Sequence, residues 1–163
     1  MNVTQKEKGF TIIEVVLVLA IAGLIFLMVF IALPALQRSQ RDGQRKSDVS
    51  RILTQLTSYT TNNRGASPAS LITTTGGGSK SFVQNYLAGS APSVAGTDYV
   101  DPTTGNGYTF LAAGTAPSVV GQIGYQPSAI CGVDGSTTGG TSRQFALTIF
   151  LESQSTPYCV DNH

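Results

Sequence analysis

Residues 9–36 read GFTIIEVVLVLAIAGLIFLMVFIALPAL, and Glu14 is the one charged residue in this stretch. From residue 15 to residue 36 the chain runs for twenty-two residues without a charge. A helix of about twenty apolar residues is long enough to cross the hydrocarbon core of a bilayer. We therefore predict a membrane-spanning helix near the N-terminus, with Glu14 close to one of its ends.

The composition of the rest of the chain limits its class. The 163 residues suit one domain with an appendage, and only 12% of them are charged, about half of what is usual in a globular protein. Beyond residue 51 there are three basic residues against five acidic ones, which are Asp98, Asp101, Asp134, Glu152 and Asp161. No basic surface is expected in this distal region, so we predict no specific nucleic-acid partner.

Two ordinary explanations compete for the apolar stretch, and a third concerns Glu14. A secretory signal peptide has an apolar core of about 7–15 residues followed by a small-residue cleavage site, and here the core is too long and no such site follows. A plain signal anchor fits the length but leaves Glu14 unexplained, because a carboxylate in hydrocarbon costs roughly 3 kcal/mol. A glutamate that reaches back to the interface from the end of the span is the third alternative.

A more specific match comes from residues 6–14, KEKGFTIIE. This segment closely resembles the cleavage motif of type IV prepilins. The resemblance implies that residues 1–9 are a leader, which a prepilin peptidase removes by cutting between Gly9 and Phe10 on the cytoplasmic face before the new amino group of Phe10 is methylated. A glycine before the cut fits physically, because it lets a protease approach the backbone closely.

The resemblance also gives Glu14 a role in assembly. Cleavage would create a cationic amine on Phe10, four residues before Glu14, and opposite charges in a low-dielectric medium become less costly when they pair. The spacing permits pairing within one chain or between two chains. The family implies the second, in a homo-oligomeric helical filament built by an inner-membrane assembly platform from subunits that are held in membrane lipid beforehand.

The charge distribution around the span favours the opposite orientation. Two basic residues and the amino terminus precede the span, whereas five basic residues follow it by Arg51. The positive-inside rule would place the N-terminus outside. We nevertheless predict a cytoplasmic N-terminus, because the cleavage motif is more specific than the charge rule and because Asp42 and Asp48 are placed to pair locally with the arginines.

The helix is expected to continue beyond the membrane. Residues 10–36 form its assembly half, and residues 37–64 form an amphipathic second half with an apolar stripe at helical spacing. The stripe comprises Val49, Ile52, Leu53, Leu56 and Tyr59. Residues 38–48 are polar on every face, and the sequence NNRG at 62–65 predicts the end of the helix with a left-handed Asn or Gly.

Gly23 and Pro34 are the expected weak points of this helix. Proline removes one backbone hydrogen bond and clashes with the preceding turn. In the pilin family a glycine and a proline bracket a stretch that loses helicity on assembly, although Pro34 lies about three residues later than in the commonest pattern. A simple kink near the membrane exit is the alternative.

Residues 65–163 are rich in Gly, Ser, Thr and Pro and predict a β-rich head. We expect one short helix around residues 82–87 and strands over 108–112, 123–126 and 145–151. An antiparallel sheet of three or four strands would pack on the apolar stripe. The predicted fold class is therefore α+β, with a long N-terminal helix packed on a small antiparallel sheet, and this resembles the head of a pilin.

Cys131 and Cys159 are the only cysteines. In an exported domain such a pair favours a disulfide, which would stabilise the fold by roughly 3.6 kcal/mol in the chain-entropy model. Two unrelated buried thiols are the alternative. A metal site has less support, since His163 is the only histidine and no CxxC spacing occurs.

Little in the sequence predicts catalysis, and we expect neither an enzyme nor a cofactor. There is no Ser/His/Asp arrangement, no phosphate-binding loop and no GxSxG motif. Asp98 and Asp101 are weak candidates for calcium ligands, because carboxylates beside Pro and Gly are more often turn formers.

Three functions remain open at this point. The first is a structural subunit of an extracellular type IV pilus that serves adhesion to host or other cell surfaces, twitching motility or DNA uptake. The second is a minor pilin or pseudopilin of a competence or type II secretion system. The third is a monomeric membrane-anchored binding domain, which predicts an uncleaved N-terminus and no filaments.

Overall fold

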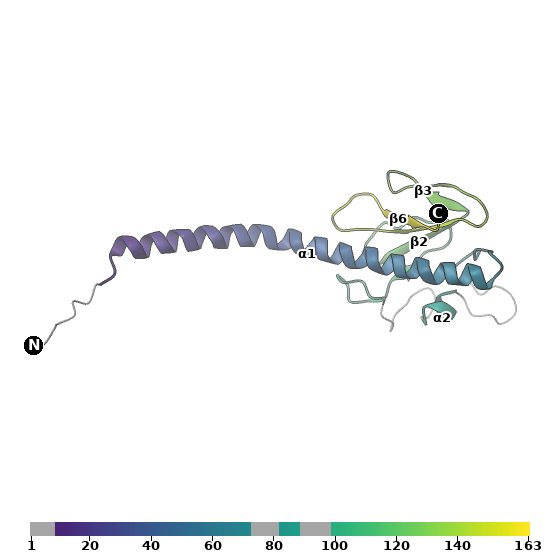
Figure 1. Cartoon of the computed structure of the whole chain (residues 1–163), viewed down its shortest axis with the longest axis horizontal. Helices are drawn as coiled ribbons and strands as arrows, with labels where there is room; N and C mark the ends of the chain where they lie inside the picture. Colours follow the sequence, from purple (N-terminus) through teal and green to yellow (C-terminus); the bar gives the residue numbers. More distant parts are fainter. Residues whose placement is uncertain (1–8, 73–81, 89–98) are drawn as a thin grey trace, which may run out of the picture. The chain divides into compact units, whose positions relative to one another are not determined.

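The computed structural model describes residues 9–72, 82–88 and 99–163. The chain forms two compact units, Met1–Gln37 and Arg38–His163. Helix α1 (Ile12–Asn62) contains 51 residues and contributes to both units (Figure 1). The predicted leader, apart from Gly9, and the calcium candidate Asp98 lie outside the described residues.

The first unit consists of the apolar half of α1. Its large side chains, from Phe10 to Leu36, are exposed, and α1 is the one described helix that is long and apolar enough to cross a membrane. Gly23 and Pro34 both lie inside the uninterrupted helix. The loss of helicity that the pilin family implies for this stretch therefore concerns the assembled state and stays a prediction.

Helix α1 ends where the sequence predicted. The amide of Gly65 donates to the carbonyl oxygen of Thr60 (2.7 Å), which is the long hydrogen bond of a Schellman cap. Gly65 has φ +82°, as expected for a glycine at this place. Arg64 is also left-handed, with φ 59°, so the residue that turns the chain is an arginine and not one of the two asparagines.

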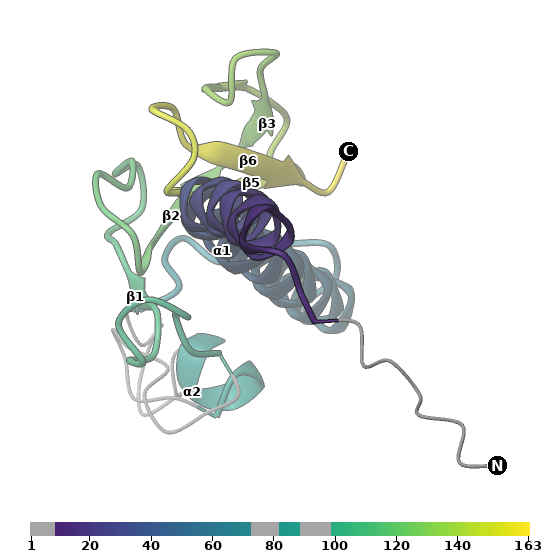
Figure 2. The same cartoon turned by 90° about the vertical axis from the view of Figure 1, so that its left-hand side faces the viewer.

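The head contains a four-stranded sheet in the order β1-β2-β5-β6. Its strands are β1 (Thr109–Phe110), β2 (Gln122–Pro127), β5 (Phe145–Ile149) and β6 (Tyr158–Asp161). A separate hairpin of β3 (Ala129–Cys131) and β4 (Thr137–Gly139) follows β2, and the short helix α2 spans Phe82–Tyr86. The architecture is α+β and pilin-like, with α1 beside the sheet (Figure 2).

The sheet differs from the expected one in two ways. Strands β1 and β2 pair in parallel, so the prediction of a wholly antiparallel sheet was wrong at this edge. The strand expected over 108–112 is only two residues long, and the one expected over 145–151 ends at Ile149. Strands β3, β4 and β6 were missed, because they are three or four residues long and are flanked by Gly, Pro or Asn, which are depleted in strands.

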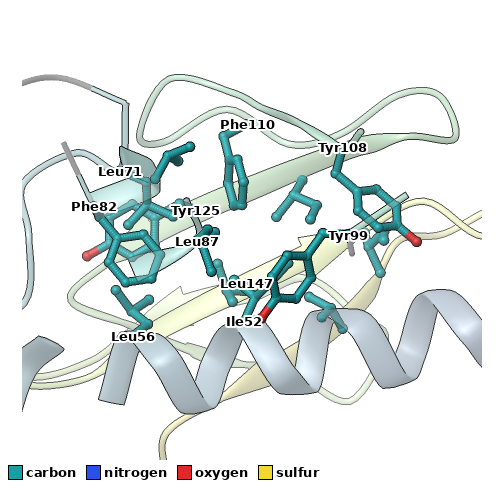
Figure 3. Packing of buried hydrophobic residues seen from close by; sticks show 14 of the residues in the cluster. Ile52, Leu56, Leu71, Phe82, Leu87, Tyr99, Tyr108, Phe110, Tyr125 and Leu147 are labelled. Carbon is teal, nitrogen blue, oxygen red and sulfur yellow. The ribbon is translucent and has the colours of Figure 1, made fainter. Parts of the chain in front are cut away.

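The core forms where the apolar stripe of α1 meets the sheet. Val49, Ile52 and Leu56 are fully buried, and Leu53 and Tyr59 pack at the margin of the same cluster. Alternate residues of β2 and β5 contribute to it from the sheet; these are Ile123, Tyr125, Phe145, Leu147 and Ile149. Figure 3 shows Ile52 and Leu56 on α1 below Leu147, Leu87 and Phe82. The predicted stripe is therefore the core face of the helix.

The expected disulfide joins Cys131 of β3 to Cys159 of β6. The backbone amide of Cys131 also donates to Asp161 on β6 (2.6 Å). These two links attach the hairpin β3–β4 to the edge strand of the sheet.

A partly buried ionic cluster joins α1 to the segments of the head that contain Asp101 and Glu152. The side chain of Arg45 is fully buried and donates to Asp42 (2.9 Å), to Asp101 (2.7 and 3.2 Å) and to Thr103 (2.6 Å). Glu152 accepts two hydrogen bonds from Arg41 (2.9 and 2.6 Å) and lies 2.8 Å from Arg45. We call Arg41, Asp42, Arg45, Asp101 and Glu152 the arginine cluster.

Residues 38–48 are polar on every face, as the sequence predicted, but three of their side chains are buried. Asp42, Arg45 and Asp48 are buried, and Asp42 also accepts hydrogen bonds from the amides of Glu152 and Ser153 (both 2.9 Å). The expected local pairs are present, as Arg45 contacts Asp42 and Arg51 contacts Asp48. The cluster joins three segments that are far apart in the sequence, because a buried charge must be paired and hydrogen-bonded.

The cluster holds its carboxylates in the ionised form. Hydrogen bonds from Arg41 above all lower the pKa of Glu152 to about 2. Burial opposes ionisation of Asp42 and Asp101, yet the hydrogen bonds that they accept hold the pKa of each below its ordinary value. Asp48 behaves in the opposite way, since burial raises its pKa.

The shift at Glu152 predicts how stability responds to acid. A carboxylate whose pKa is lowered in the folded state stabilises that state fully above its unfolded pKa, and the stabilisation is lost as the pH falls through the folded pKa. We expect the difference in free energy of unfolding between wild type and Glu152→Gln to be largest above pH 4.5 and to shrink toward pH 2. Guanidinium unfolding of the detergent-solubilised chain at several pH values measures it. A difference that stays constant over this range would contradict the assignment.

Candidate assembly site at the start of helix α1

The peptide bond between Gly9 and Phe10 lies just before α1. No atom lies within 4 Å of the position that a Cβ on Gly9 would take, and the side chain of Phe10 is 89% exposed. Nothing in the described part of the chain therefore covers this bond. Cleavage of this bond by a peptidase stays a prediction.

Thr11 and Glu14 form a reciprocal cap on the first turn of α1. The backbone amide of Thr11 donates to Oε2 of Glu14 (2.9 Å), and the hydroxyl of Thr11 donates to the same oxygen (2.7 Å). In return the amide of Glu14 points to the Thr11 hydroxyl oxygen (3.4 Å). Because α1 begins at Ile12, Thr11 is the N-cap residue and Glu14 is the third residue of the helix. This is the capping box, in which two amides without helical partners are satisfied.

The capping box gives Glu14 a role within a single chain. A carboxylate at the N-terminal end of a helix is stabilised by the unpaired amides and by the helix dipole. From the sequence, Glu14 was expected to pair with the Phe10 amine or to reach the membrane interface, and its partner Thr11 was missed. The signal was present in the sequence, since Thr-x-x-Glu directly before an apolar run is the pattern of a capping box.

One carboxylate oxygen of Glu14 remains available. Both Thr11 donors contact Oε2, and Oε1 accepts no hydrogen bond from any described residue. In the uncleaved chain the nitrogen of Phe10 is part of a peptide bond and carries no charge. Pairing of Glu14 with a Phe10 amine is therefore a prediction for the processed form, and the cap leaves an oxygen for it.

An apolar groove lies beside this exposed carboxylate. The groove measures about 320 Å³ and is lined by Phe10, Glu14, Val15, Val18 and Leu19. A negative charge at the margin of an apolar groove favours a partner that brings both a cation and apolar surface. The geometry suits the docking of another chain or of lipid, and it offers no arrangement for catalysis.

The other predicted site residues lie away from this end of α1. Cys131 and Cys159 form the disulfide in the head, and both carboxylate oxygens of Asp101 bind Arg45, which assigns this calcium candidate to the arginine cluster. Among the described residues no group of three or more His, Cys, Asp and Glu is placed to hold a metal ion.

Comparison with known families bears on the same segment. Residues 4–30 match the family model described as the prokaryotic N-terminal methylation motif. This match supports a class III signal peptide of the kind found in type IV pilins and pseudopilins. Neither a curated protein nor a solved structure matches the chain significantly.

The capping box makes a prediction about the first turn of α1. Thr11→Ala removes one donor and one acceptor of the cap and should destabilise the helix start by about 1 kcal/mol, whereas Thr11→Ser keeps the hydroxyl. Hydrogen exchange of the chain in detergent micelles should show faster exchange at residues 12–15 for Thr11→Ala and wild-type rates for Thr11→Ser. Equal exchange in both variants would show that the cap does not hold this turn.

Proposed function

We propose that the chain is a structural subunit of an extracellular type IV pilus. The observation that carries this proposal is the methylation motif over residues 4–30, which leads directly into an exposed apolar helix. A prepilin peptidase removes residues 1–9, and Phe10 becomes the methylated N-terminus. An inner-membrane assembly platform then transfers subunits from lipid into a helical homo-oligomer.

The apolar half of α1 supports polymerisation. Nearly every large side chain between Phe10 and Leu36 is about half exposed or more, so this surface needs lipid before assembly and other copies of the helix afterwards. Within a membrane, hydrophobicity gives helices no reason to associate, because lipid tails are equally apolar. A charge at Glu14 supplies a reason, since pairing it with the amine of a neighbouring Phe10 removes two isolated charges from hydrocarbon.

The disulfide supports the predicted orientation of the chain. Disulfides persist in oxidising compartments and are rare in the cytosol, and both cysteines of this chain are paired. A head outside the cytoplasmic membrane places the N-terminus inside, against the simple count of basic residues. Ion pairs also lessen that conflict, because three of the five basic residues after the span are bound by carboxylates.

The experiment that tests the function joins mass spectrometry with electron microscopy. Native protein from sheared surface material should begin at methylated Phe10 and should come from filaments. An intact Met1 terminus without filaments would replace the proposal with a monomeric membrane-anchored domain. A processed N-terminus on a minor component of short fibres would instead favour a minor pilin or pseudopilin.

Substitutions of Glu14 separate its cap from its charge. Gln supports a capping box as Glu does, so Glu14→Gln should keep the helix start and normal processing while removing the ionic pair. We expect Glu14→Gln and Glu14→Ala both to be cleaved and both to lose filaments. If Glu14→Gln forms normal filaments while Glu14→Ala does not, then the carboxylate acts through the cap and not through its charge.

A further inference from the structure

Two exposed arginines of the head lie near the C-terminal end of helix α1. Arg64 and Arg143 are exposed and form no ion pair with any described residue. They belong to the same end of the head, because the position of a Cβ on Gly65, the residue after Arg64, is 3.5 Å from Nε of Arg143. We call Arg64 and Arg143 the distal arginine pair.

The matching negative charge is Asp134. Four carboxylates of the described head form ion pairs, namely Asp42, Asp48, Asp101 and Glu152. Asp161 accepts hydrogen bonds from the amides of Cys131 and His163. Asp134 hydrogen-bonds to the amide and hydroxyl of Ser136 and is exposed, so among the described side chains of the head it is the exposed carboxylate without an ion pair.

Asp134 lies at the edge of a hollow that suits an arginine. The hollow measures about 500 Å³ and is lined by the turn of the hairpin at 132–135 and by residues 154–159. The two walls meet closely, since a Cβ on Gly135 would lie 2.2 Å from the carbonyl oxygen of Pro157. Val133 is fully exposed beside Asp134 and offers apolar contact to the methylene stem of an incoming side chain.

The two charged features lie at opposite ends of the head. The hollow lies at the start of β6, because Pro157 directly precedes Tyr158. Tyr158 pairs with Ile149, the last residue of β5. Three residues after Ile149, the amide of Glu152 donates to Asp42 of α1. Arg143 lies beside Gly65, just beyond the other end of the same helix. Positions 42 and 62 of α1 are separated by roughly 30 Å at 1.5 Å per residue. A copy displaced along this direction would bring unlike charges together.

We propose that in the filament the distal arginine pair of one subunit docks in the Asp134 hollow of a second copy. The contact is heterologous, with different surfaces on the two copies, and heterologous contacts that do not close generate helical filaments. This inference rests on the proposed function and names the partner surfaces that it would use in the head.

A charge swap tests the docking. Asp134→Arg and Arg143→Asp each replace attraction with repulsion at every contact, and we expect each to lower the mass of sheared filaments at least about five-fold. The double variant has the net charge of wild type and restores the attraction with reversed sign, so it should recover most of the filament mass. Wild-type filaments should also dissociate more readily at high salt.

Two controls keep the result specific. Arg143 lies near the C-terminal end of α1, where a cation also stabilises the helix dipole, so unfolding curves must show that each variant folds. Arg64→Asp, alone and with Asp134→Arg, repeats the swap at the second arginine. Arg38→Asp combined with Asp134→Arg has the same net charge as the swap but should not restore filaments.

The possible results distinguish this inference from the function on which it rests. If wild type makes no filaments, the proposed function fails and the docking falls with it. Two results would show that the docking is wrong while the proposed function stands. In the first, wild type makes filaments and both single charge reversals leave the filament mass unchanged. In the second, neither double variant yields more filament mass than the lower-yielding of its two single variants.

Discussion

An apolar helix surface without cover is the constraint on which the rest of the molecule depends. In the first half of α1 the large side chains are exposed on all sides, and no other described element packs on them. Such a surface is stable only in lipid or against other copies of itself. The backbone tolerates both environments, because every interior amide of a helix is satisfied within the helix. In the proposed assembly, the polar features at the ends of the helix would decide when it leaves lipid and which surface it contacts.

The second half of α1 solves a different problem with the same secondary structure. Its stripe of Val49, Ile52 and Leu56 was readable from helical spacing, because periodicity reports which face meets a core. The arginine cluster could not be predicted from the sequence. Arg45 finds Asp101 and Glu152 far along the chain, and a sequence pattern reports local neighbours only. A run of charged residues usually forms a solvated face. Here part of the run is buried, because carboxylates from distant segments pair with its arginines.

The candidate site shows how much a motif reveals and what it conceals. The segment around Gly9, Phe10 and Glu14 was predictable as a unit, and the family match covers it. The partner of Glu14 in the single chain was overlooked, although Thr-x-x-Glu spacing encodes it. The strands of the head were the least predictable elements, since β1, β3, β4 and β6 are held by pairing and by the disulfide more than by their own propensity.

The cap formed by Glu14 is compatible with its proposed pairing to a second chain, and together the two would restrict assembly. A capped carboxylate is held in one direction, so less conformational entropy is lost when a second chain binds it. The same reasoning applies to the proposed contact between heads, although each exposed ion pair contributes at most about 1 kcal/mol. Apolar helices gain similar contact area in many registers, whereas a charge finds its partner in only one. Polar contacts therefore supply the difference in free energy between registers, and specificity depends on such a difference. The apolar surface supplies the contact area.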